Sequence, residues 1–178
     1  MLYKAILSLP VLAVLAYAQP VGVGIKLGVP ATEAFNVLQN PNQSVTETHH
    51  YTVGAYGELR IPAGLALEFD ALYRTYDVQS AATHAWEFPV LVKHRILPGP
   101  IKPFFDAGLS FSHLSDIKVS SLQHLSNFGV VVGGGVELKI LSMRMGPELR
   151  YTGWWVHNFD GQVQSNRNQL EVLFGIGF

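Results

Sequence analysis

The chain ends in Gln169-Leu170-Glu171-Val172-Leu173-Phe174-Gly175-Ile176-Gly177-Phe178, and this stretch decides the fold. Leu170, Val172, Phe174, Ile176 and Phe178 occupy alternate positions, while mostly polar residues or glycine stand between them. Successive side chains of a β-strand point to opposite faces of the sheet. The stretch is therefore predicted to be one strand with an apolar face and a polar or small face.

The same alternation recurs in seven earlier segments, which span residues 21–29, 51–61, 65–75, 86–96, 101–111, 128–140 and 143–151. Three of the connections are short, and the other four, including 77–83, are longer. Short turns at one end and longer loops at the other are typical of outer-membrane barrels. The sequence therefore predicts an all-β fold, an eight-stranded antiparallel up-and-down transmembrane β-barrel.

The charged residues indicate which face of each strand points outward. Seventeen of the 25 charged residues lie on the polar faces of the eight segments, and none lies on an apolar face. An eight-stranded barrel has an interior just wide enough to be filled by side chains. The glycine-rich, charge-balanced faces fit that interior better than faces rich in Trp, Phe, Tyr and Leu. We therefore predict that the apolar faces meet lipid.

Buried charges need partners, so the inward faces are predicted to form an ion-pair network that rigidifies the barrel. A continuous channel is not expected with eight strands. The predicted members of the network are Lys26, Glu58, Arg60, Glu68, Asp70, Arg74, Glu87, Lys93, Glu137, Lys139, Arg144, Glu148 and Arg150.

The composition excludes several classes of function. Charged residues make up only 14% of the chain, and the net charge of −1 lacks the basic excess of a nucleic-acid-binding protein. The chain has no cysteine, which excludes disulfides, thiolate metal sites and cysteine nucleophiles.

The N-terminus has the pattern of an export signal. Lys4 precedes an apolar run, and Ala16-Tyr17-Ala18 supplies the small-x-small pattern of a signal peptidase site. We expect residues 1–18 to be a signal peptide cleaved between Ala18 and Gln19, and residues 19–178 to form the barrel domain. The apolar run is too short to span a bilayer comfortably as an anchor.

The chain resembles known outer-membrane proteins in two respects. Phe174, Ile176 and Phe178 are similar to the C-terminal signal that the barrel-assembly machinery reads. The layout resembles the OmpA/OmpX-like small barrels of the outer membrane protein beta-barrel domain family, acidobacterial type, through Val23-Gly24-Ile25-Lys26-Leu27-Gly28-Val29-Pro30, Leu67-Glu68-Phe69-Asp70-Ala71-Leu72-Tyr73, Trp86-Glu87-Phe88-Pro89 and Gly146-Pro147-Glu148-Leu149-Arg150-Tyr151. The resemblance implies a fold and a location, but the family shares no defined activity.

One segment is a catalytic candidate. His113 and Ser115 resemble the His-x-Ser-Asn motif of outer-membrane lipid A deacylases, in which a His activates a Ser and an acid orients the His. Asp116 stands where the motif has Asn, and no outward acid is seen on the next strand. A chance pairing at a loop mouth is the favoured interpretation, so no catalytic residue is predicted.

Two further patterns have simpler structural explanations. His49, His50, His124 and His157 lie in or beside predicted loops without metal-ligand spacing, and we predict neither a metal site nor a cofactor. Gly133-Gly134-Gly135 lacks the lysine and helix of a phosphate loop. Glycine within a strand more often marks a close approach at a barrel wall.

The sequence thus predicts a monomeric outer-membrane protein with a structural or surface-interaction role. The expected partners are outer-membrane lipid and lipopolysaccharide, with the assembly machinery and periplasmic chaperones during biogenesis. Two alternatives stay open, a lipid A deacylase-like hydrolase and a secreted soluble barrel of lipocalin type that binds a small apolar ligand.

Overall fold

A computed structural model describes residues 21–32, 35–37, 51–78, 81–115, 126–155, 163–165 and 167–178 of the chain. The predicted signal peptide and its cleavage position lie outside these residues. No helix in the described ranges is long and apolar enough to cross a bilayer.

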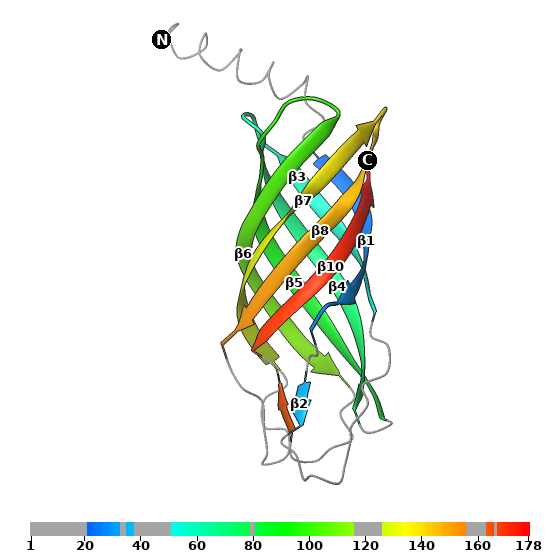
Figure 1. Cartoon of the computed structure of the whole chain (residues 1–178), viewed down its shortest axis with the longest axis vertical. Helices are drawn as coiled ribbons and strands as arrows, with labels where there is room; N and C mark the ends of the chain where they lie inside the picture. The colour runs from blue at the N-terminus through cyan, green and yellow to red at the C-terminus, as the bar shows by residue number, and fades with distance from the viewer. Residues whose placement is uncertain are drawn as a thin grey trace, which may run out of the picture.

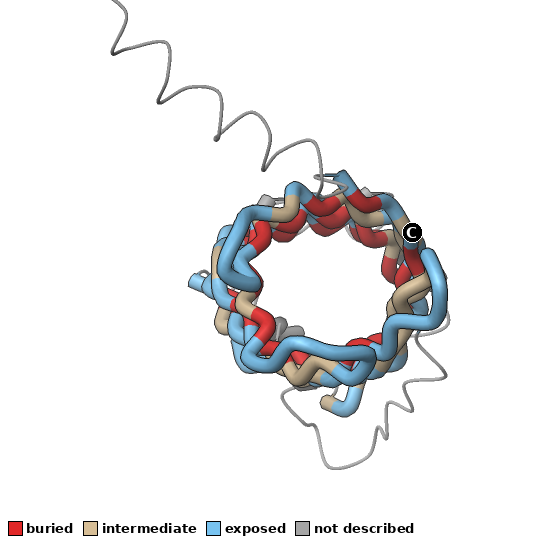
Figure 2. The backbone as a smooth tube through the Cα atoms, turned by 90° about the horizontal axis from the view of Figure 1, so that it is seen from above, coloured by how far each residue is buried: buried red, intermediate tan, exposed pale blue. Residues whose placement is uncertain are grey.

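Eight strands form one closed barrel, in the ring order β1-β10-β8-β7-β6-β5-β4-β3. Every neighbouring pair is antiparallel. Figures 1 and 2 show the tilted strands and the closed ring that they form. The barrel strands are β1 (Val21–Pro30), β3 (Thr52–Arg60), β4 (Leu65–Val78), β5 (Ala81–Arg95), β6 (Ile101–Ser115), β7 (Ser126–Ile140), β8 (Met143–Trp154) and β10 (Asn168–Gly177).

The ring closes where the first and last barrel strands meet. Lys26 of β1 is paired with Gly175 of β10 on one side and with Gly54 of β3 on the other. Closure leaves no strand edge with unpaired backbone groups, as a barrel in lipid requires. The C-terminus lies at the end of the barrel that carries the short turns, as Figure 1 shows. At one of these turns Gly64 has a φ of +77°, a left-handed conformation that glycine adopts without strain.

The strands are longer at the loop end than the sequence predicts. The predicted loop 77–83 is wrong, because Asp77 pairs with Ala82 and Val78 with Ala81, which leaves only residues 79 and 80 between β4 and β5. β6 likewise continues to Ser115. The alternation of apolar residues stops before backbone pairing does, so the sequence pattern underestimates these strands.

Two short strands lie beyond the loop end of the barrel. β2 (Phe35–Val37) and β9 (Val163–Ser165) pair with each other in a separate two-stranded sheet. Three residues are too few to show a period of two, and the sequence pattern did not reveal them.

Burial alternates along the barrel strands. In β1, for example, Val21, Val23 and Ile25 are exposed on the outer wall, whereas Gly22 and Lys26 are buried inside. We use the term outer wall for the outward-facing side chains of the eight barrel strands. The apolar faces thus point out and the polar faces point in, as the sequence predicts.

Candidate functional site

The centre of the barrel interior is occupied by a cluster of opposite charges. The Nζ atom of Lys26 lies 2.6 Å from Oε1 of Glu68, 3.1 Å from Oδ2 of Asp70 and 3.1 Å from Oε2 of Glu148. All four side chains are almost fully buried. Lys93 adds a second ammonium group that bonds the other oxygen of Glu68. Two lysines therefore face three carboxylates, so a further cation is needed to balance the charge.

Arg150 supplies that balance from the opposite wall. Its Nη1 atom donates a hydrogen bond of 2.8 Å to Oδ2 of Asp70, and its Nε atom donates one of 2.7 Å to Oε1 of Glu148. The side chain is fully buried. Hydrogen bonds between ionised groups are the strong ones, and the planar guanidinium can hold two carboxylates at once.

A second cluster lies toward the short turns. The guanidinium of Arg95 contacts both Glu58 and Glu137, with 2.7 Å between its Nη2 and Oε2 of Glu137. Arg60 donates from Nε to Oε1 of Glu58 at 2.7 Å, and Arg144 pairs with Glu137 at 3.1 Å. Both carboxylates thus contact two arginines each, and the cluster links β3, β5, β7 and β8.

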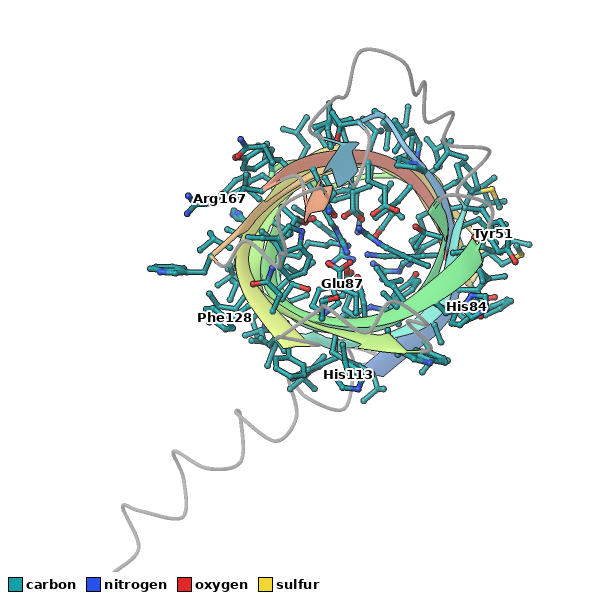
Figure 3. All side chains as sticks on the ribbon, turned by 90° about the horizontal axis from the view of Figure 1, so that it is seen from below. Tyr51, His84, Glu87, His113, Phe128 and Arg167 are labelled. Carbon is teal, nitrogen blue, oxygen red and sulfur yellow. The ribbon has the colours of Figure 1, made fainter. Side chains whose placement is uncertain are left out.

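A third cluster lies toward the long loops. Arg74 on β4 contacts Glu171 on β10 and places its Nε 2.9 Å from Oε2 of Glu87 on β5. Ser110 donates to Oε1 of Glu87 at 2.8 Å, and Thr52 donates to Glu171. Figure 3 shows Glu87 inside the ring of strands.

The structure places twelve of the thirteen predicted network residues in these three clusters and corrects one. Lys139 is exposed, and no ion pair within the described ranges includes it. It is one residue from the end of β7 and is paired with Arg144, so it lies at the end of the wall and away from the carboxylates.

Three buried charged residues were left out of the predicted network. Arg95 and Glu171 are buried and paired, as described above. Asp106 is buried, but its two carboxylate oxygens have no hydrogen-bond partner among the described residues. The alternation of polar and apolar residues that indicated the other members also places these three on inward faces. The sequence pattern could therefore have predicted them.

Apolar side chains fill the remaining interior between the clusters, chiefly Leu72, Leu91, Phe104, Val131 and Leu173. Glycines keep the wall close to these groups. At Gly135, for instance, a Cβ atom would lie 2.2 Å from the carbonyl oxygen of Pro147, so the glycine triplet serves close packing. One cavity of about 30 Å³ lies between the central and turn-side clusters, room for a water molecule or two. The charge clusters and these apolar side chains thus occupy the described interior from the turn end to the loop end.

The outer wall is almost free of charge. Among the side chains that the structure describes, only two charged ones are exposed, Lys139 at the turn end and Arg167 at the loop end. Aromatic side chains gather on the wall near the loop end, where Tyr73 contacts both His84 and Trp86 and where Phe128 contacts Trp155. Figure 3 shows Tyr51, His84, His113 and Phe128 on the outside of the ring.

The catalytic candidate lies on this aromatic part of the wall. His113 is exposed and its backbone pairs with that of Trp86, while Ser115 pairs with His84. The side chain of Ser115 lies outside the described residues, as do His49, His50, His124 and His157.

The residues of the predicted assembly signal lie at the turn end of β10. Phe174 and Phe178 are exposed on the outer wall, and Ile176 is half-buried beside them. Phe178 donates its backbone N–H to the carbonyl of Val23, which joins the C-terminus to the first strand.

Three similar solved structures are outer-membrane proteins. The outer membrane protein OprG from Pseudomonas aeruginosa gives a TM-score of 0.62 at 12% identity, over 88% of this chain and 92% of that one. Neisserial surface protein A gives 0.60 at 18% identity, over 89% and 96%. The outer membrane enzyme PagL gives 0.53 at 16% identity, over 85% and 97%.

No family model and no curated protein sequence matches the chain. The resemblance to the acidobacterial members therefore stays a prediction. At identities this low, the likeness to the solved structures shows the fold alone. The chain has the closed, eight-stranded antiparallel barrel fold that these outer-membrane proteins share.

Proposed function

We propose that the chain is an integral protein of the bacterial outer membrane with a structural or surface-interaction role in the envelope. One observation carries this proposal, the separation of charge between the interior and the outer wall. Ionised groups are paired inside, while the outer wall presents Val, Ile, Leu and aromatic side chains to its surroundings. In water such a surface would be a large aggregation-prone patch, whereas in lipid it is the favourable one.

The residues at the two ends of the outer wall also support a position of the barrel in the membrane. The exposed charges Lys139 and Arg167 lie at its two ends, and Tyr73, Trp86 and Trp155 lie near the loop end. Aromatic and basic side chains favour the two membrane–water interfaces. In this proposal the long loops face the cell exterior and the short turns face the periplasm.

Export through a signal peptide cleaved after Ala18, and assembly through the C-terminal residues Phe174, Ile176 and Phe178, belong to the same proposal. Periplasmic chaperones and the barrel-assembly machinery are then the partners during biogenesis, and lipid and lipopolysaccharide are the partners afterwards. A closed barrel has no edge strand to share, which supports a monomer.

Fractionation of cells that express the full chain tests the location. We expect the protein in the outer-membrane fraction, with different gel mobility before and after boiling, because a folded barrel resists detergent until it is heated. Recovery as a soluble protein of the periplasm or medium would favour the lipocalin-type alternative and overturn the proposal.

The same purified protein tests the absence of transport through the interior. The three charge clusters and the apolar side chains between them support a closed lumen, so planar bilayers containing the barrel should show no stable ionic current. A stable single-channel conductance would contradict a purely structural or surface role.

We propose no catalytic role for His113 and Ser115. The deacylase motif has Asn where this chain has Asp116, and a His and a Ser two positions apart at a loop mouth arise readily by chance. Mass spectrometry of lipid A from cells with the wild-type protein and with His113→Ala should give identical spectra. Loss of an acyl chain in the wild type only would establish the hydrolase alternative.

A further inference from the structure

A hollow lies at the loop end of the barrel, where β7, β8 and β10 are neighbours. It has a volume of about 400 Å³ and is lined by Val130, Gly153, Trp154, Trp155, Arg167 and Asn168; we call it the rim hollow. The backbone of Gly153 pairs with Val130 on one side and with Asn168 on the other, so these residues form its floor. Sites for small ligands have volumes of roughly 300 to 1,000 Å³.

Gly153 lines the rim hollow without a side chain of its own. The three atoms nearest to a Cβ atom built there all belong to the side chain of Tyr151, and the closest is at an ordinary contact distance of 3.6 Å. The backbone at this position thus accepts a larger residue, and glycine is not required by packing. A larger side chain at this position would enter the hollow that Gly153 lines.

Arg167 gives the rim hollow a positive charge. Its Nε donates to the carbonyl of Trp154 at 3.3 Å and its Nη2 donates to that of Trp155 at 3.4 Å, which fixes the guanidinium at the end of β8. No carboxylate of the described residues pairs with it. An arginine has five N–H groups in a planar fork that suits two oxygens of a phosphate, so most of its donors stay available.

The hollow also lies at the level of the aromatic side chains. The backbone N–H of Trp155 bonds the carbonyl of Phe128, and the rings of these residues are 6.5 Å apart. Figure 3 places Arg167 and Phe128 on the outside of the ring, on the same side of the barrel. In the proposed orientation this is the headgroup region of the outer leaflet, with the apolar wall below it.

We propose that the rim hollow binds the phosphate-bearing headgroup of an anionic lipid in the outer leaflet. Arg167 donates to the phosphate oxygens, Asn168 lines the polar side, and an acyl chain follows Gly153 and Val130 down the wall. Charge complementarity selects the headgroup, and the adjoining apolar wall selects a lipid over a free phosphate. This inference rests on the proposed membrane location.

Tryptophan quenching tests the proposal directly. The chain has three Trp residues, and Trp154 and Trp155 both line the rim hollow. In a Trp86→Phe background their fluorescence reports this place alone. The protein is reconstituted in phosphatidylcholine vesicles that contain either brominated phosphatidic acid or the same fraction of brominated phosphatidylcholine. We expect about a tenfold enrichment of phosphatidic acid at the site, equivalent to about 1.4 kcal/mol.

Three variants identify the groups responsible. Arg167→Gln removes the positive charge of the rim hollow, and Gly153→Val places a side chain in it. Each variant should bring the enrichment of phosphatidic acid over phosphatidylcholine close to one. Lys139→Gln removes the other exposed charge, at the opposite end of the wall, and should leave the enrichment unchanged. Unboiled gel mobility shows that each variant is folded before the lipids are compared.

The possible results distinguish failure of the proposed lipid site from failure of the proposed membrane location. Equal quenching by both lipids in the parent protein, or an unchanged preference in Arg167→Gln, overturns the site and leaves the membrane location intact. Absence of quenching by either lipid overturns both. If an equal concentration of inorganic phosphate displaced phosphatidic acid, the rim hollow would be a site for free phosphate. That result would also overturn the proposal that it binds a lipid.

Discussion

The Nη1 atom of Arg150 on β8 lies 2.8 Å from Oδ2 of Asp70 on β4, although these two strands stand opposite each other in the ring. The bond therefore crosses the whole interior. Arg74 on β4 and Glu171 on β10, which are not neighbouring strands, also meet. Ion pairs across the lumen thus connect strands of the wall that are not neighbours in the ring.

Replacement of Arg150 with methionine should destabilise the barrel strongly. The change leaves Asp70 and Glu148 buried with one fewer cation, and removal of one partner of a buried pair typically costs about 3–5 kcal/mol. Urea-induced unfolding in lipid vesicles, followed by tryptophan fluorescence, measures the loss. Lys139→Met is the matched control and should change the free energy of unfolding by less than about 0.5 kcal/mol, because Lys139 is exposed. Equal stability of the two variants would show that the central cluster does not hold the barrel together.

Two isosteric substitutions should show that loss of a paired carboxylate costs more stability than loss of a carboxylate without a described hydrogen-bond partner. Glu68 contacts Lys26 and Lys93, so Glu68→Gln removes charge from two bonds and should cost about 2–4 kcal/mol. Asp106 has no hydrogen-bond partner among the described residues, so Asp106→Asn should cost less than about 1 kcal/mol. The same unfolding experiment compares them, and a larger loss in Asp106→Asn than in Glu68→Gln would refute the assignment.

A charge on the middle of the outer wall should be costly only if that wall meets lipid. Val132 lies in the middle of β7 and is exposed, so Val132→Lys should lower the stability in lipid vesicles by about 2–4 kcal/mol. Ile140→Lys lies at the turn end of the same strand and should cost about 0–1 kcal/mol. If Val132→Lys were as stable as Ile140→Lys, the outer wall would not be in the hydrocarbon.

Two glycines should respond in opposite ways to alanine. A Cβ atom at Gly108 would lie 1.9 Å from the carbonyl oxygen of Val90, so Gly108→Ala must displace backbone and should cost about 1–3 kcal/mol. At Gly57 nothing lies within 4 Å of the added atom. Gly57→Ala should be neutral or stabilising by up to about 1 kcal/mol, because alanine loses less conformational freedom on folding. Refolding yields and unfolding curves of the two variants check this contrast.

Much of the barrel follows from side-chain alternation alone. The period of two in 21–29 and in 169–178 located β1 and β10, and the absence of charge from the apolar faces indicated which face points outward. The ends of the strands were harder to predict. β4 and β5 continue to Val78 and Ala81 through residues without an apolar face, because backbone hydrogen bonds need no particular side chain.

The candidate sites were predictable to different degrees. The polar faces of the predicted strands indicated which residues belong to the interior network. Lys139 is the exception, because it lies near the end of β7 and its side chain is exposed. The rim hollow was not foreseen. It depends on Gly153 pairing with both Val130 and Asn168, and the sequence places these three residues on separate strands with no common motif.

The sequence by itself determined which side chains face outward and which face one another, because a strand has only two faces and a shift of one residue exchanges them. Only the tertiary structure decided the partners, such as Arg150 with Asp70 and Arg95 with Glu137. Those pairs depend on how the ring closes and how far each strand is staggered against the next, and that geometry is a property of all eight strands together.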